Sequence, residues 1–123
     1  MISIPNFILK RLYVKGSLIT THNGMEFQLL NKLGSGYTRR LLPLTIDGHD
    51  IPIDQCKFIV DERQVPFNAV TKENPFTLAL NKVTTVSVHN VNLTKEAHNI
   101  GMGFEVAGLG VLKFDFTDIP TND

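Results

Sequence analysis

The 123-residue sequence contains no tryptophan, two tyrosines and a single cysteine, and it has no excess charge of either sign. A single Cys56 excludes an internal disulfide. The 12 acidic and 12 basic residues balance, which argues against nucleic acid or a membrane surface as partner, because those contacts depend on an excess of Lys and Arg. No apolar run approaches the roughly 20 residues that span a bilayer. The shortage of large aromatics also weakens a carbohydrate-stacking platform.

The beginning of the chain lacks the basic segment and long apolar stretch of a secretory signal. Together with the unpaired cysteine, this favours the cytoplasm as the compartment. The length fits one domain that buries its own core without disulfides or metal. We therefore expect a single β-sandwich domain over residues 1–123, with a polar tail at 118–123.

Local β-signals recur along the chain. The strongest is Leu44–Ile53, in which two short apolar-polar alternations flank Asp47-Gly48, because an Asp-Gly turn supplies the positive φ angles that a tight hairpin needs. Asn23-Gly24 is a second turn signal. After it, Met25, Phe27 and Leu29 alternate with polar residues, which is the period of a half-buried strand.

Other segments extend this pattern. Residues 7–14 are rich in β-formers, residues 83–88 are rich in β-branched side chains, and Leu112, Phe114 and Phe116 alternate near the end. Only residues 94–99 are compatible with a helical turn. The predicted fold class is all-β, an antiparallel β-sandwich of immunoglobulin-like character with at most one short helical turn.

Histidines are the first candidates for chemistry. His89 and His98 bracket the loop 90–97, so they could approach each other at one end of the sandwich. One hypothesis makes His98 an acid or base that Asp50 or Glu96 orients. The commoner arrangement is a buried or half-buried histidine bonded to a loop carbonyl. The spacing is not a metal motif, and we expect no metal and no cofactor in this chain.

The remaining histidines and the cysteine are weaker candidates for catalysis. His22 and His49 fall in predicted turns, where exposed polar residues are normal. Cys56 precedes the apolar strand 57–60, where a small buried thiol is commoner than a nucleophile. The catalytic candidates are therefore His98, His89 and Asp50.

The segment 34–40 carries two glycines, Tyr37 and the pair Arg39-Arg40. These residue types suit contact with an anionic or hydroxyl-rich partner. The phosphate-loop spacing is absent. Because adjacent strand residues point to opposite faces, we expect at most one of the two arginines at any given site. Tyr37, Arg39 and Arg40 are the predicted partner-interface residues.

The order of these segments resembles a known family. The run Tyr37-Thr38-Arg39-Arg40-Leu41-Leu42-Pro43-Leu44, then Thr45 to Pro52 and finally His98-Asn99-Ile100, is similar to the small β subunits of bacterial C-glycoside deglycosidases. The resemblance implies a TIM-barrel partner of xylose-isomerase-like fold, which would hold a divalent metal and the catalytic residues. This chain departs from that pattern in having Arg40-Leu41 where a glycine is expected.

The resulting functional hypothesis is a small non-catalytic accessory subunit of a hetero-oligomeric, carbohydrate-active enzyme. Tyr37, Arg39 and Arg40 would dock on the barrel. One alternative is a free-standing sandwich enzyme with a His-based acid/base site. Another is a homo-oligomeric structural or binding module.

Overall fold

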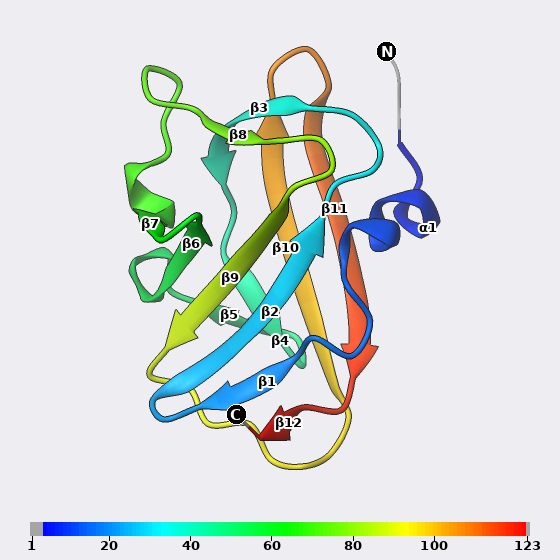
Figure 1. Cartoon of the computed structure of the whole chain (residues 1–123), viewed down its shortest axis with the longest axis vertical. Helices are drawn as coiled ribbons and strands as arrows, with labels where there is room; N and C mark the ends of the chain where they lie inside the picture. The colour runs from blue at the N-terminus through cyan, green and yellow to red at the C-terminus, as the bar shows by residue number, and fades with distance from the viewer. Residues whose placement is uncertain (1–3, 123) are drawn as a thin grey trace.

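Two β-sheets pack face to face in the computed structural model, which describes residues 4–122 (Figure 1). Sheet A has the order β12-β1-β2-β9-β6-β7, and sheet B has the order β5-β4-β10-β3-β8, with β11 paired to β10. The strands of sheet A are β1 (Ile19–Thr21), β2 (Gly24–Leu30), β6 (Cys56–Val60), β7 (Arg63–Pro66), β9 (Val83–His89) and β12 (Thr121–Asn122). Those of sheet B are β3 (Gly36–Leu41), β4 (Leu44–Ile46), β5 (His49–Ile51), β8 (Phe76–Leu78), β10 (His98–Val106) and β11 (Gly110–Asp118).

The short helical segments are α1 (Asn6–Leu9) and the 3-10 helices η1 (Lys10–Leu12), η2 (Ile53–Gln55) and η3 (Phe67–Ala69). Every pairing between named strands is antiparallel except β1 with β12, which is parallel. The predicted antiparallel β-sandwich is therefore confirmed.

Aromatic side chains join the two sheets across the core. Phe58 of sheet A stacks on Phe76 of sheet B with ring centroids 4.1 Å apart. Phe27 of sheet A meets Phe116 of sheet B edge-on, at 5.1 Å. Each side chain is at most 6% exposed, and burying a phenylalanine stabilises a fold by about 1.5–3 kcal/mol. The period-2 pattern of the sequence thus becomes the contact between the layers.

The turns follow the sequence closely, with one shift. Asp47 and Gly48 both have positive φ, 52° and 84°, as a type I′ hairpin turn requires, so the β4–β5 hairpin is confirmed. The β1–β2 turn, however, is formed by His22-Asn23, and Gly24 is already the first residue of β2. A Cβ at Gly24 would overlap the carbonyl oxygen of Val88. This glycine therefore permits close strand approach.

The N-terminal segment departs from its prediction. Residues 7–14 form α1, η1 and a single bridging residue instead of a strand. Leu9 and Leu12, three positions apart, are 2% and 3% exposed, so one helical face is buried, and both helices contact β11. The carbonyl of Pro5 accepts the first helical hydrogen bonds. Tertiary burial has overridden local β-propensity here.

The other helix prediction, for residues 94–99, is also wrong. Residues 94–97 are loop, and His98 and Asn99 begin β10, where they pair with Asp118 and Thr117. Long pairing along β10 and β11 favours the extended conformation.

The segment predicted as a polar tail is more ordered than that description implies. Asp118 is the last residue of β11, and Thr121–Asn122 pair with β1. Position 123 lies outside the described residues. In Figure 1, β12 lies beside β1, so the chain passes from sheet B to sheet A after β11.

Candidate functional site

A β-bulge in β3 places two arginines on one face of sheet B. Glu105 of β10 pairs with Arg40, whereas Val106 pairs with Thr38, so Arg39 is the extra residue. Thr38 and Leu41 are buried, and the two arginines between them both lie on the outer side. The expectation that only one arginine could serve a site is wrong, because a bulge interrupts the alternation of the strand.

One carboxylate holds both guanidinium groups. Arg39 Nε donates to Glu105 Oε2 at 2.6 Å, and Arg40 Nε donates to Oε1 at 3.1 Å. Both hydrogen bonds lower the pKa of Glu105, and the bond from Arg39 has the larger effect. Such exposed pairs contribute little to stability. Their effect is to orient the two arginines through Nε, and the hydrogen bonds of residues 4–122 include none from their Nη atoms.

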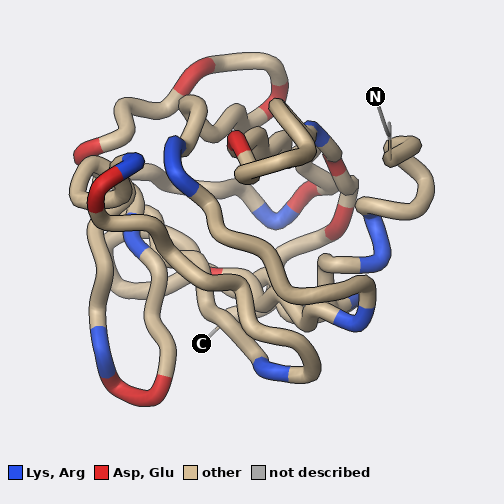
Figure 2. Tube along the Cα trace, turned by 90° about the horizontal axis from the view of Figure 1, so that it is seen from above, with Lys and Arg blue, Asp and Glu red and all other residues tan. Residues whose placement is uncertain are grey.

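The two arginines line a hollow of about 430 Å³. We call it the basic groove; its lining residues are Arg39, Arg40, Val70, Thr71, Lys72 and Glu105. Three cations against one carboxylate give the lining a formal charge of +2. Elsewhere, basic and acidic segments are interspersed around the trace (Figure 2). Tyr37, 61% exposed, lies on the same outer side of β3.

His98 forms a structural pair with Asp47. Its Nδ1 lies 2.7 Å from Asp47 Oδ2, and the backbone N–H of Asn99 donates to Oδ1 at 2.9 Å. His98 Nε2 lies 3.1 Å from both the carbonyl oxygen and the hydroxyl of Thr94. The Asp47 bond raises the pKa of His98, and the same bond lowers the pKa of Asp47.

Both ring nitrogens of His98 are therefore engaged within the protein. The carboxylate at Nδ1 favours a proton on that nitrogen, and Nε2 faces a carbonyl oxygen, which only accepts, and a hydroxyl, which can donate or accept. The His98–Asp47 pair fastens the loop before β10 to the β4–β5 turn. This geometry is the buried histidine bonded to a loop carbonyl that the sequence offered as the commoner arrangement.

The other histidine and carboxylate candidates lie apart from this pair. His89 ends β9 in sheet A and is exposed. Asp50 lies in β5 and lines a different hollow on the outer face of sheet B. No hydrogen bond among the described residues joins His89 or Asp50 to His98. Sequence reasoning missed Asp47 as the partner of His98, because strand register is needed to bring it there.

The remaining candidates from the sequence lie at positions that suit no catalytic role. His22 and His49 are exposed. Cys56 is 2% exposed, and burial raises the pKa of its thiol to about 12, so the thiolate is scarce at neutral pH. Within the described part of the chain, no group of three His, Cys, Asp or Glu side chains could hold a metal ion. None of the helices in residues 4–122 has the length and apolar character needed to cross a membrane.

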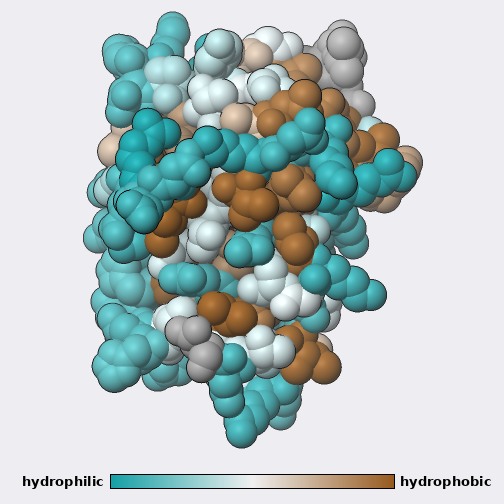
Figure 3. Space-filling model, in the orientation of Figure 1, coloured by the Kyte–Doolittle hydropathy of each residue, from teal (hydrophilic) through white to brown (hydrophobic). Residues whose placement is uncertain are grey.

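Hydrophobic surface gives no alternative site on the face of sheet A. In Figure 3, which shows that face, the brown areas are separated by teal and white side chains. The basic groove differs from the hollow beside Asp50 in its charge, since its lining has three cations and one carboxylate, whereas Asp50 and Asp115 outnumber Lys113 in the other.

Comparison with known proteins identifies one family. Residues 8–120 match the family model described as hydroxymethylglutaryl-CoA reductase, N-terminal domain. No curated protein matches the chain significantly.

This match corrects the expectation drawn from resemblance. The chain is not a C-glycoside deglycosidase β subunit, and the accessory role in carbohydrate metabolism is wrong. The match does not favour the free-standing His-based enzyme or the homo-oligomeric module either. The features behind the resemblance, an Asp-Gly hairpin and an extended arginine-bearing strand, occur in many sandwiches. The barrel partner and its divalent metal followed from that resemblance alone and stay predictions.

Proposed function

The chain belongs to the family of the hydroxymethylglutaryl-CoA reductase N-terminal domain, and we propose that it is a non-catalytic module that docks on an acidic segment of a reductase. The docking surface consists of Tyr37, Arg39, Arg40 and Lys72. The observation that carries the proposal is the bulge in β3, which places Tyr37 and both arginines on one outer face.

The chemistry of this surface suits a protein carboxylate. Arginine binds carboxylates with two parallel N–H bonds, and Glu105 occupies only the Nε atoms. An incoming Asp or Glu side chain can therefore meet the outer edges of both guanidiniums, while Lys72, which also lines the groove, adds attraction. Tyrosine and arginine are also the residues most enriched at the centres of protein interfaces.

The engagement of His98 supports a docking role over a catalytic one. A general acid or base must reach a substrate proton with a free position, and both nitrogens of His98 are bonded internally. We extend the proposal to a cytoplasmic location, which the single buried Cys56 supports, since the fold needs no oxidising compartment.

The test measures binding between this chain and the catalytic portion of the reductase from the same organism, by titration calorimetry at two salt concentrations. The double variant Arg39→Ala/Arg40→Ala should bind at least tenfold more weakly and lose most of the salt dependence. Arg63→Ala is the matched control, because Arg63 is an exposed cation on β7 of sheet A. Wild-type chain that does not bind, or a double variant that binds as tightly as wild type, would refute docking through this surface.

A further inference from the structure

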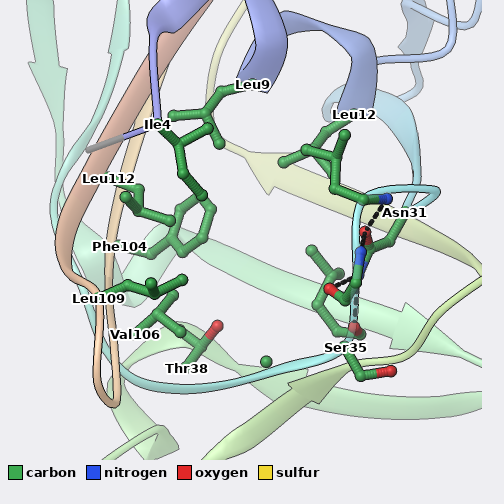
Figure 4. Close-up of a pocket in the computed structure, with 14 residues that line it drawn as sticks. Ile4, Leu9, Leu12, Asn31, Ser35, Thr38, Phe104, Val106, Leu109 and Leu112 are labelled. Atoms are coloured by element: carbon green, nitrogen blue, oxygen red, sulfur yellow. Dashed lines mark hydrogen bonds between the residues drawn. The ribbon is translucent and has the colours of Figure 1, made fainter. Parts of the chain in front are cut away.

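A cavity opens on the inner side of sheet B at one end of the sandwich, beneath the N-terminal helices (Figure 4). We propose that it binds a short aliphatic group carrying one hydroxyl or carbonyl oxygen. We call it the end cavity; its volume is about 70 Å³. Its walls come from the N-terminal segment, the loop around Asn31, β3 and the β10–β11 hairpin. The apolar side chains that define it are Ile4, Leu9, Leu12, Phe104, Val106 and Leu112.

One polar group in this wall faces the cavity. Thr38, on the inward side of β3, is 4% exposed as a whole residue. No buried side-chain nitrogen or oxygen among the described residues lacks a hydrogen-bond partner, so the Thr38 hydroxyl is not sealed unpaired in the core. Figure 4 shows the Thr38 oxygen directed into the cavity, near Phe104 and Val106. Thr38 also borders a smaller void of about 10 Å³ deeper in the core. A molecule that offers a donor or an acceptor to the Thr38 hydroxyl would gain a hydrogen bond inside the cavity.

The other polar side chains of the wall make hydrogen bonds within the protein, Asn31 at both amide atoms and Ser35 as an acceptor. The Asn31 amide nitrogen donates to the carbonyls of Gly34 and Leu78, both at 2.8 Å, and its oxygen accepts from two backbone N–H groups. The Ser35 hydroxyl oxygen accepts the backbone N–H of Leu80.

A water molecule in the end cavity would meet the Thr38 hydroxyl in a wall that is mostly apolar, whereas buried waters make about three hydrogen bonds. The wall suits a ligand with an apolar body and a single oxygen.

The volume limits the ligand. A dry apolar cavity of about 150 Å³ holds benzene, so a space half that size fits about three to five heavy atoms. Leu33 and Leu109 border the cavity, and Leu33 is 42% exposed, so a longer chain could leave the protein between them. This site faces inward from β3, whereas the proposed docking surface faces outward, so each can fail without the other.

The experiment uses 2-propanol as a polar probe and xenon as an apolar one, followed through methyl signals in NMR spectra of ¹³C-labelled protein. We expect saturable shifts at Val106, Leu109 and Leu112 with both probes. Thr38→Val keeps the shape and removes the hydroxyl, so 2-propanol should bind at least tenfold more weakly while xenon still binds. Retained xenon binding also shows that the variant is folded around an intact cavity.

Two further variants sharpen the result. In Gly36→Ala the new Cβ would lie 3.1 Å from Val106 Cγ1, so the cavity narrows and both probes should weaken. Thr77→Val, at an exposed threonine of β8, should bind both probes as wild type does. The proposal is overturned if 2-propanol gives only linear, non-saturating shifts, or if Thr38→Val binds it as tightly as wild type.

Discussion

Removal of one hydroxyl group tests how the N-terminal segment is fixed to the sandwich. Tyr13 O–H donates to Asp118 Oδ2 at 2.7 Å and accepts the backbone N–H of Leu18 at 3.2 Å. Its ring stacks on Phe116 with centroids 3.6 Å apart. Tyr13→Phe keeps this stacking and deletes both hydrogen bonds, and it leaves the N–H of the fully buried Leu18 without that partner.

Loss of a bond to a carboxylate together with an unpaired N–H costs about 2 kcal/mol. In a domain of this size that corresponds to a fall of roughly 8 °C in melting temperature. Urea unfolding followed by far-UV circular dichroism measures the free energy directly. The slope with urea should not change, because the variant exposes no additional surface on unfolding.

The pH dependence supplies a second readout. The Tyr13 hydrogen bond is the main cause of the lowered pKa of Asp118. Stability from a lowered carboxyl pKa is present above the unfolded value of about 4 and is lost as the pH falls through the folded value. The stability difference between wild type and Tyr13→Phe should therefore shrink from pH 6 to pH 3.

Tyr37→Phe is the matched control, since the Tyr37 side chain is 61% exposed, and it should change stability by less than about 0.5 kcal/mol. A Tyr13→Phe variant no less stable than this control would refute the assigned role of the hydroxyl.

Two further perturbations concern the pair at the end of the sandwich and the core. Because the pKa of His98 is raised in the folded protein, the stability that the His98–Asp47 pair contributes is complete below about pH 6.5 and is lost as the pH rises through the folded pKa. Asp47→Asn should therefore flatten the dependence of melting temperature on pH between 6 and 9. An unchanged slope would contradict the role of the pair. Phe58→Ala removes a ring packed between Phe67 and Phe76 and should cost about 3–5 kcal/mol in urea unfolding, whereas Phe7→Ala, at a side chain 66% exposed, should cost less than about 0.5 kcal/mol.

Features set by neighbouring residues were predictable. The Asp47-Gly48 hairpin and the alternation of Met25, Phe27 and Leu29 depend on turn chemistry and on the strand period, both of which are local. The N-terminal helices were not predictable in this way. The spacing of three between Leu9 and Leu12 indicates a helix, but their neighbours favour a strand. Only packing against β11 decides between helix and strand in this segment.

The candidate site required information that local sequence does not carry. Tyr37, Arg39 and Arg40 were identified by residue type, but the bulge depends on the register between β3 and β10. Lys72 also lines the groove, but it lies in the polar segment 71–75, whose sequence indicates only a loop between strands. Likewise, Asp47 and His98 are 51 positions apart, and nothing near either residue identifies the other as its partner.

The position of β9 between β2 and β6 determines when sheet A can form during synthesis. β2 is complete at residue 30, and until residues 83–89 are made it has only the short β1 as a neighbour. Closing the intervening segment 31–82 costs chain entropy before any pairing is gained. A nascent chain that ends before residue 83 therefore presents Phe27 and Leu29 on an unpaired strand edge. Such an edge can bind a chaperone or pair with another unfolded chain and aggregate.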